Sequence, residues 1–418
     1  MRKQAVSALV VSLFVAGACS SADNQSASSS TAQSPVPSTS SSTTSTSSTS
    51  TTSTTAAPLL AETFVPASTD SLLPVEDCKI PDVTPSTPTG IFNNSSGFPI
   101  PDGAVTQTGE VKLWVIPVET SDFQASEQGL ADLEASLEKV ADFFDEQSYG
   151  RASLRYSIEA ESNWVRFPGT ASEYGFGESK YQQDFSPVMQ EILENWIPSG
   201  PVSENDLVMA VLPPVPGVVV AMSTRRFDLK RFNNVLLQNG VLISSGGNEI
   251  RTWELQAHEL GHSWMRLEDL YHGRGDVPYQ DYMGSWDIMA DAASKDPNFS
   301  SWSRWRSGWI DDAEVLCVTP TIASKHFVGL VENSSARPKA LVIPTSSNST
   351  IIVEVRGGGS GAPVPLAYTV DTSIEHQLGP YRVQSAIVAS QTAVIGDVTL
   401  TLVDRDSSGV VIEVGPTP

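Results

Sequence analysis

Apolar residues recur at helical spacing in one long stretch of the N-terminal half of the chain. The stretch begins near Ser126, whose hydroxyl can cap a helix, and ends near Gln147, with Gly150 just beyond it. Its apolar positions, three or four residues apart, are Leu130, Leu133, Leu137, Val140 and Phe144. This period predicts an amphipathic helix over residues 126–147.

Shorter apolar runs on both sides of this helix predict strands at 111–118, 153–160, 207–211 and 218–222. A second helix is predicted over residues 249–265, because apolar residues again return on one face. That face is formed by Ile250, Trp253, Ala257, Leu260 and Trp264. Together these segments predict a region in which helices and strands are mixed.

After Trp309 the pattern changes to short runs rich in Val, Ile and Thr, separated by Gly, Pro, Asn, Asp and Ser. Residues 406–409 have the composition of a hairpin turn. Helical spacing does not return in this part of the sequence. The runs lie at 341–343, 351–355, 367–370, 398–403 and 410–414. We therefore expect an antiparallel β-sandwich-like domain of about 100 residues.

These patterns divide the chain into an α+β region at 106–312 and a β-rich C-terminal domain at 313–418. Residues 59–105 are rich in Pro, Ser and Thr and weak in period, so we interpret them as an N-terminal wrap or a pro-segment. Residues 19–58 contain a Ser/Thr-rich tract with almost no bulky apolar side chains, which favours a disordered tether.

The first 18 residues have the features of a targeting segment. Arg2 and Lys3 precede an apolar run that is too short to span a bilayer comfortably. The run ends in Ala-Gly-Ala before Cys19, which resembles a bacterial lipoprotein signal. The resemblance implies a signal peptide at 1–18 and lipid on Cys19, with the membrane reached through this anchor alone. An ordinary secretory signal is the alternative, and both predict an extracytoplasmic protein, at the cell surface or secreted.

Composition narrows the classes of function. The 418 residues include 25 Lys and Arg against 48 Asp and Glu, a formal net charge of −23. A nucleic-acid binder needs a basic face for the phosphate backbone. Binding to anionic lipid needs clusters of Lys and Arg. The acidic balance argues against both classes.

The candidate chemistry lies in His258-Glu259-Leu260-Gly261-His262. On a helix, residues four apart share one face about one turn apart, so both imidazoles can bind one Zn²⁺. Glu259 points about 100° away from His258 and can act on water at the metal as a general base. The apolar stripe on the same helix predicts a buried, rigid element, which suits residues that hold a metal.

A third ligand has to come from another part of the chain. In zinc proteases of the metzincin type the motif continues as HExxHxxGxxH or HExxHxxGxxD, and the glycine turns the chain back to the metal. Counting from His258 puts the last position at Glu268, with Asp269 directly after it, and the glycine position at Met265. The spacing favours Glu268 as the third ligand, with Asp269 as the alternative and His272 as a further candidate.

The chain has three cysteines, too few for a disulfide scaffold or a Cys-rich zinc module. With Cys19 lipidated, Cys78 and Cys317 remain, and in an exported protein we expect a disulfide between them. The alternative is a Cys78 thiolate that caps the metal in a latent form, because Cys78 lies upstream of the zinc motif.

Several segments, in order along the chain, resemble the immune inhibitor A-type secreted metalloproteases. The segments are 143–150, 269–271, 284–289, 301–310, 351–356 and 368–371. Together with the zinc motif and the strand-like run that begins at Val111, the resemblance covers roughly residues 111–371. The resemblance implies a metzincin-like catalytic domain, a twisted mixed sheet with helices and a zinc helix, followed by a β-rich domain. It also implies one catalytic Zn²⁺ and hydrolysis of peptide bonds in extracellular polypeptides.

Carried onto this sequence, the resemblance assigns His258 and His262 as zinc ligands and Glu259 as the catalytic base. The family's third carboxylate falls on Glu268 when counted from His258, or on Asp269 when aligned on Asp-Leu-Tyr. The polypeptide substrate is expected to lie extended along an edge strand. Residues 241–244 are a candidate for this strand, and a buried core strand is the alternative interpretation of the same residues.

Other parts of the resemblance concern packing and departures from the family. Met289 matches the methionine of the turn beneath the metal. The sequence Trp-Met-Arg-Leu at 264–267 departs from the family's Leu-Gly-Leu-Pro, and His272 stands where the family usually has Asp. These departures point to a repositioned ligand or to reduced activity. The candidates for oxyanion support are Tyr271, Tyr279 and Tyr282.

Two other functions fit parts of the sequence. A surface-displayed binding protein that keeps the fold without efficient catalysis is favoured by Met265 at the glycine position. A closed structural zinc site would need a fourth ligand, for which His272 is the nearby candidate. Acidic loops leave Ca²⁺ open as an additional ion, although the sequence has no Asp-x-Asp-x-Asp-Gly loop.

Overall fold

The computed structural model describes residues 58–66, 68–83, 94–101, 104–174, 186–212, 220–224, 231–232, 235–237, 239–244, 252–271, 282–292, 297–357, 362–374, 378–387 and 392–418. Leu59–Pro418 forms one compact unit. It combines a few helices with several sheets, in which both parallel and antiparallel pairs occur, and this agrees with the predicted α+β class. The predicted signal peptide, Cys19 and the tether up to residue 57 lie outside the described residues.

The N-terminal sheet has the strand order β2-β1-β4-β8-β5, with β3 pairing the end of β1. β1, β2, β4 and β8 are parallel, and β5 runs antiparallel to β8. Its strands are β1 (Gly109–Glu119), β2 (Ala152–Ile158), β3 (Val165–Arg166), β4 (Leu207–Leu212), β5 (Val220–Thr224) and β8 (Gly240–Ser244). The four predicted strands are confirmed with small shifts at their ends. The candidate edge strand at 241–244 is wrong, because β8 lies between β4 and β5.

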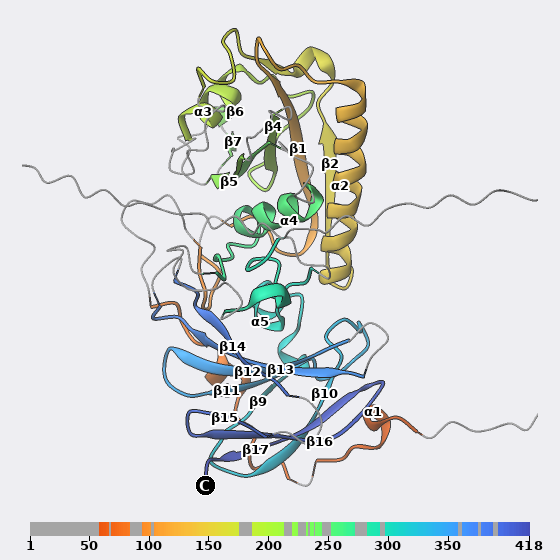
Figure 1. Cartoon of the computed structure of the whole chain (residues 1–418), viewed down its shortest axis with the longest axis vertical. Helices are drawn as coiled ribbons and strands as arrows, with labels where there is room; N and C mark the ends of the chain where they lie inside the picture. The colour runs from red at the N-terminus through yellow and green to blue at the C-terminus, as the bar shows by residue number, and fades with distance from the viewer. Residues whose placement is uncertain are drawn as a thin grey trace, which may run out of the picture. The chain divides into compact units, whose positions relative to one another are not determined.

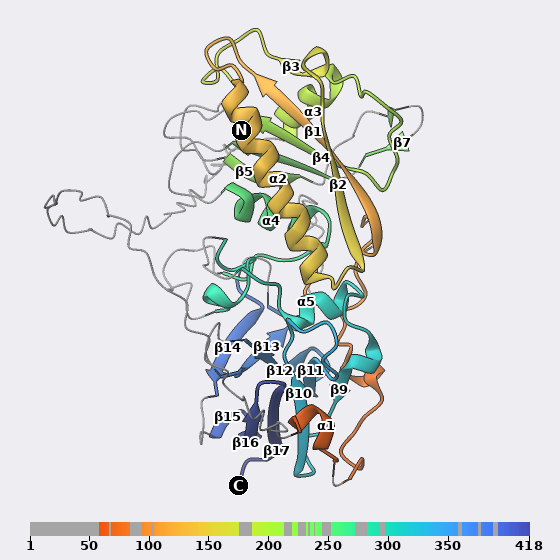
Figure 2. The same ribbon diagram turned by 90° about the vertical axis from the view of Figure 1, so that its right-hand side faces the viewer.

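Alternate residues of β1 face two different helical layers. Leu113 and Val115 belong to the core that includes buried residues of α2 and α4. Trp114 and Ile116 point the other way and pack with α3. Both views show α2 running along β1 and β2 (Figures 1 and 2). The helices are α2 (Glu127–Gln147), α3 (Ser186–Asn195) and α4 (Thr252–Ser263).

The predicted helix at 126–147 is confirmed as α2. The Ser126 hydroxyl accepts a hydrogen bond from the backbone N–H of Gly129 at 3.0 Å, so this residue is the cap that the sequence indicated. Gly150, just beyond the helix, has a φ of +74°. The predicted zinc helix is α4, and residues 249–251 of that prediction lie outside the described residues.

Two sheets form the C-terminal region, ordered β14-β13-β12-β11-β9 and β10-β17-β16-β15. Apolar residues of both sheets share one core, so the sheets pack face to face, as Figure 1 shows. The predicted sandwich is not wholly antiparallel, because β9 pairs parallel with β11. The strands are β9 (Val315–Cys317), β10 (Ser324–Gly329), β11 (Ala340–Pro344), β12 (Ser349–Arg356), β13 (Val364–Asp371), β14 (Tyr381–Ala386), β15 (Thr392–Ile395), β16 (Val398–Asp406) and β17 (Gly409–Pro416).

Shorter elements connect these layers. β16 ends at Asp406 and β17 begins at Gly409, so the predicted hairpin turn is confirmed. The described chain also contains α1 (Leu60–Thr63), α5 (Ser301–Arg306), the pair β6 (Arg231–Phe232) and β7 (Val235–Leu236), and 3₁₀ turns at Val75–Cys78, Glu161–Asn163, Gly284–Trp286 and Asp312–Glu314. In the part of the chain that the structure describes, the helices are all too short or too polar to serve as bilayer-spanning segments.

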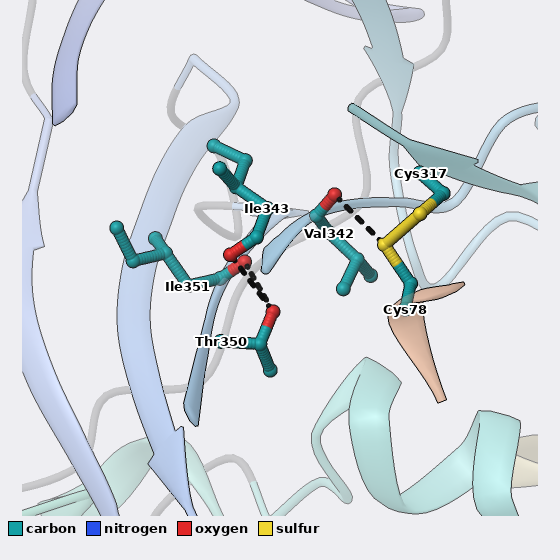
Figure 3. Close-up of a disulfide and its surroundings, with 6 residues drawn as sticks. All are labelled: Cys78, Cys317, Val342, Ile343, Thr350 and Ile351. Carbon is teal, nitrogen blue, oxygen red and sulfur yellow. Dashed lines mark hydrogen bonds between the residues drawn. A yellow bond between two sulfur atoms is a disulfide. The ribbon is translucent and has the colours of Figure 1, made fainter. Parts of the chain in front are cut away.

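The N-terminal segment at 59–105 is joined covalently to the C-terminal region. Cys78 and Cys317 form a disulfide with a Cα–Cα distance of 5.8 Å (Figure 3). The backbone N–H of Leu73 donates to the carbonyl oxygen of Cys317 at 2.8 Å, and that of Thr319 donates to Ser71 at 2.9 Å. The predicted disulfide is therefore confirmed, and the alternative of a metal-capping Cys78 thiolate is wrong.

Candidate metal centre

Both histidines of the zinc motif and one carboxylate meet at a single point. The Nε2 atoms of His258 and His262 are 3.2 Å apart. Asp269 Oδ1 lies 3.3 Å from His258 Nε2 and 3.1 Å from His262 Nε2. Two ligands that bind zinc at ~2.0–2.1 Å with tetrahedral angles lie roughly 3.3 Å from each other. The three atoms thus have the spacing of three corners of a zinc tetrahedron, and among the described residues this group could hold a metal ion.

The imidazole rings are oriented by main-chain carbonyl groups. His258 Nδ1 lies 2.9 Å from the oxygen of Ile288, and His262 Nδ1 lies 2.7 Å from the oxygen of Leu267. Because a carbonyl oxygen can only accept, each Nδ1 carries a proton and each Nε2 of a neutral ring presents a lone pair. Asp269 Oδ1 is buried, and while both rings are neutral neither Nε2 has a hydrogen to donate to it. Two lone pairs and a carboxylate oxygen therefore converge where a cation would satisfy all three.

The turn after α4 decides which carboxylate reaches this point. The chain adopts the left-handed conformation at Arg266, with a φ of 57°. This is one residue later than Met265, the position that the zinc-protease spacing reserves for glycine. The extra residue brings Asp269 to the imidazoles in place of Glu268. The preference for Glu268 is corrected: its side chain is buried at 6% exposure but does not belong to the group.

Electrostatic coupling within the group is strong. Burial alone would lower the pKa of His258, but a hydrogen bond to Asp269 and the charges of Glu259 and Asp269 outweigh it and raise the pKa to about 9. Burial would raise the pKa of the Asp269 carboxyl, but the two imidazoles hold it far below its usual range. Without a metal, a proton therefore occupies the group at neutral pH, and metal binding must displace it.

Glu259 and Tyr271 lie beside the group. Glu259 is 6% exposed, and its charge raises the pKa of both His258 and Tyr271. The charge of Asp269 is the main reason that the pKa of Tyr271 is well above its ordinary value, followed by burial and a hydrogen bond between the two side chains. The phenol of Tyr271 therefore stays neutral and can donate.

The other candidate residues are placed differently. Tyr282 packs its ring against Gly379, and the centre of the ring lies 5.3 Å from the guanidinium carbon of Arg382. Tyr279 and His272 lie outside the described residues.

Met289 packs directly against α4. A Cβ atom added to Gly261 would be 2.6 Å from Met289 Sδ, so the glycine allows this close approach. The Asp287 carboxylate holds the turn, because it accepts hydrogen bonds from the backbone N–H groups of Met289 and Ser300, both at 2.8 Å. Burial raises the pKa of Asp287 to about 6, although these hydrogen bonds work against the shift.

One side chain at the centre was not anticipated from the sequence. Asn94 Nδ2 lies 3.3 Å from His262 Nδ1, across a sequence separation of 168 residues. The carbonyl groups of Leu267 and Ile288 were also not anticipated. Every residue has such a group, so no residue type marks them, and Asn94 stands in a segment without periodicity.

The chain matches no protein-family model, and it finds no significant match among curated proteins. The fold and the site define it as a mixed α/β protein with a buried group of two imidazoles and one carboxylate suited to a metal ion.

Proposed function

We propose that the protein is an exported zinc metalloendopeptidase that hydrolyses peptide bonds in extracellular proteins and is held at the cell surface by lipid on Cys19. The observation that carries this proposal is the grouping of His258, His262 and Asp269 at tetrahedral spacing. Three protein ligands leave a fourth position for water, which distinguishes a catalytic zinc site from a closed structural one.

The chemistry requires a base beside that open position. Zinc, when bound, polarises a carbonyl group and makes water a stronger acid. The Glu259 carboxylate then accepts the proton of the attacking water and delivers it to the leaving amine. Its place next to His258 on α4, and its electrostatic effect on both His258 and Tyr271, support this role. The neutral phenol of Tyr271 donates to Asp269, so it could support the developing oxyanion only by turning its hydrogen away from that carboxylate.

The sheet offers a binding edge for an extended substrate. β5 stands at the end of the strand order and pairs with β8 on one side. α4, which carries the two histidines, contacts β5. A polypeptide added along the outer edge of β5 would form main-chain hydrogen bonds close to the metal group.

The substitution Glu259→Gln tests the proposal. It removes the base but neither imidazole, so the variant should keep one zinc per chain while its rate of casein cleavage falls by roughly 10²-fold or more. Wild-type cleavage should stop with a zinc chelator and return on adding zinc. Equal cleavage by the variant and the wild type would contradict the assignment.

The same measurements separate the rival functions. A closed structural site would retain zinc without proteolysis, and a metal-free binding protein would show neither. The binding-protein alternative drew its support from Met265 at the glycine position. Since Arg266 makes the turn instead and Asp269 returns to the imidazoles, that residue no longer favours it.

A further inference from the structure

Asn94 reaches the metal group from the N-terminal segment. Its side chain is 6% exposed, and its Nδ2 atom lies 3.3 Å from His262 Nδ1. The same Nδ1 lies 2.7 Å from the carbonyl oxygen of Leu267. Because the one proton on Nδ1 is donated to Leu267, that nitrogen has no lone pair to offer the amide N–H groups of Asn94.

The amide oxygen of Asn94 lacks a hydrogen-bond donor. It is buried and makes no hydrogen bond. The two ends of an amide have nearly the same shape, so a half-turn of the side chain exchanges oxygen and nitrogen without other movement. The oxygen then lies about 3.3 Å from Nδ1 and accepts a share of its proton, so the donor–donor conflict at Nδ1 disappears.

We propose that Asn94 is a positioning residue for His262, whose Nδ1–H is held between the Asn94 amide oxygen and the Leu267 carbonyl so that Nε2 faces the metal. This inference rests on the zinc site of the proposed function. Outer partners of metal-binding histidines fix the tautomer and the ring orientation, and their loss typically costs roughly 10–100-fold in metal affinity.

The residues after Asn94 are well placed to hold it. The backbone N–H of Ser95 donates to the carbonyl oxygen of Arg266, in the turn after α4, at 3.0 Å. The carbonyl oxygens of Ser96 and Gly97 accept from the side chains of Trp302 and Arg306 at 2.8 and 2.7 Å. Residues 94–97 therefore connect the ligand turn to α5.

The experiment is a competition between the protein and a chelator for zinc, which gives the dissociation constant of the full chain. Asn94→Ala should weaken zinc binding by roughly 10–100-fold. Asn94→Asp should restore it, because a carboxylate oxygen accepts the same hydrogen bond. Ser95→Ala is the matched control, because it keeps the backbone N–H that donates to Arg266 and removes only the side-chain hydrogen bond to Gly97 of 3.1 Å. It should leave zinc affinity unchanged.

A second readout follows the imidazole itself. The chain has five histidines, so ¹⁵N-histidine spectra of the metal-free protein can be assigned by substitution. The wild type should show His262 with its proton on Nδ1, and Asn94→Ala should show a mixture of tautomers. Should Asn94→Ala fail to fold, Asn94→Leu takes its place, because leucine has about the same size and cannot accept the hydrogen bond. Wild-type zinc affinity in that variant would overturn the role.

The outcomes separate this inference from the proposed function. Wild-type affinity in Asn94→Ala would overturn the positioning role and leave the zinc site intact. A wild-type protein that binds no zinc would instead overturn the proposed function. The tautomer measurement would then still decide whether Asn94 holds His262.

Discussion

One backbone angle determines which carboxylate, that of Glu268 or that of Asp269, lies beside His258 and His262. Arg266, at a φ of 57°, occupies a conformation that costs a non-glycine residue on the order of 1–2 kcal/mol. Its carbonyl oxygen accepts from Ser95, and this bond helps to hold the turn. Moving the left-handed position by one residue would present a different side chain to His258 and His262.

The pair Asp269→Asn and Glu268→Gln tests this selection. Each change removes one negative charge and keeps the size of the side chain. Asp269→Asn should lower zinc affinity by roughly 10-fold or more, because a ligating carboxylate is lost. Glu268→Gln should bind zinc like the wild type. Competition titration measures the zinc affinity of both variants. A larger loss in Glu268→Gln than in Asp269→Asn would show that Glu268 is the third ligand.

Gly261→Ala tests the contact between α4 and Met289. In a helix, alanine is favoured over glycine by about 1 kcal/mol. Here the new methyl group would meet Met289 Sδ at 2.6 Å in a fully buried site, and overpacking costs about 1–3 kcal/mol. The free energy of unfolding, from denaturant titration, should therefore fall.

Gly129→Ala on α2 is the matched control. Its nearest neighbour is the Ser126 hydroxyl at 3.2 Å, at a partly exposed position. Gly129→Ala should therefore raise the free energy of unfolding by most of the roughly 1 kcal/mol by which a helix favours alanine over glycine. A rise in stability for Gly261→Ala equal to that of the control would mean that Met289 is not packed as described.

At the scale of elements, the buried Asp287 carboxylate holds the turn beneath α4. Asp287 binds two backbone N–H groups, and Ile288 beside it accepts from His258. A change that loosens this turn should therefore also loosen the His258 ring.

The raised pKa of Asp287 gives a pH dependence with a definite sign. The folded protein holds this proton up to about pH 6, whereas the ordinary value is 3.8. The group's contribution to stability is fully present below the ordinary value and is lost as pH rises through about 6, by up to roughly 3 kcal/mol. Asp287→Asn lacks this titration but places an amide N–H against a backbone donor, which costs about 1–3 kcal/mol at every pH.

Denaturant titration of the two metal-free proteins between about pH 4 and about pH 7 measures the effect. The wild type should be the more stable at low pH, and its advantage over Asp287→Asn should shrink as pH rises. An advantage that grows with pH would contradict the assignment.

Local patterns explain which elements could be predicted. α2 was predictable with its cap because Ser126 and the apolar period lie within one stretch of sequence. The parallel pairing of β9 with β11 depends on a contact between distant segments, which periodicity does not encode. For the site, His258 and His262 could be predicted because they are four residues apart on one helix. Asp269 could not be chosen over Glu268, because the choice depends on where the chain turns. Asn94 could not be predicted, because it contacts a residue 168 positions away in the sequence.

At the scale of the whole molecule, the N-terminal segment links the region of the metal group to the sandwich. The backbone N–H of Leu60 donates to Asp406 at 2.6 Å, and the Cys78–Cys317 disulfide joins positions 239 residues apart. Further along the same segment, Asn94 contacts His262. A crosslink over so long a loop restricts the unfolded chain more than the folded one.

Replacing both cysteines, Cys78→Ser with Cys317→Ser, should therefore lower the free energy of unfolding by about 2–5 kcal/mol. Thermal unfolding of this variant and of the wild type, with and without a reductant, provides the measurement. The reductant should shift the wild type toward the variant and leave the variant unchanged. Equal midpoints in all four samples would mean that the bond does not form in solution.

Anomalous diffraction at the zinc absorption edge, from crystals of the zinc-loaded protein, tests the central claim most directly. We predict one peak within ~2.2 Å of His258 Nε2, His262 Nε2 and an Asp269 oxygen, with a solvent molecule as the fourth ligand. A zinc-loaded crystal with no peak at these three side chains, or with a peak bound by Glu268 in place of Asp269, would contradict it.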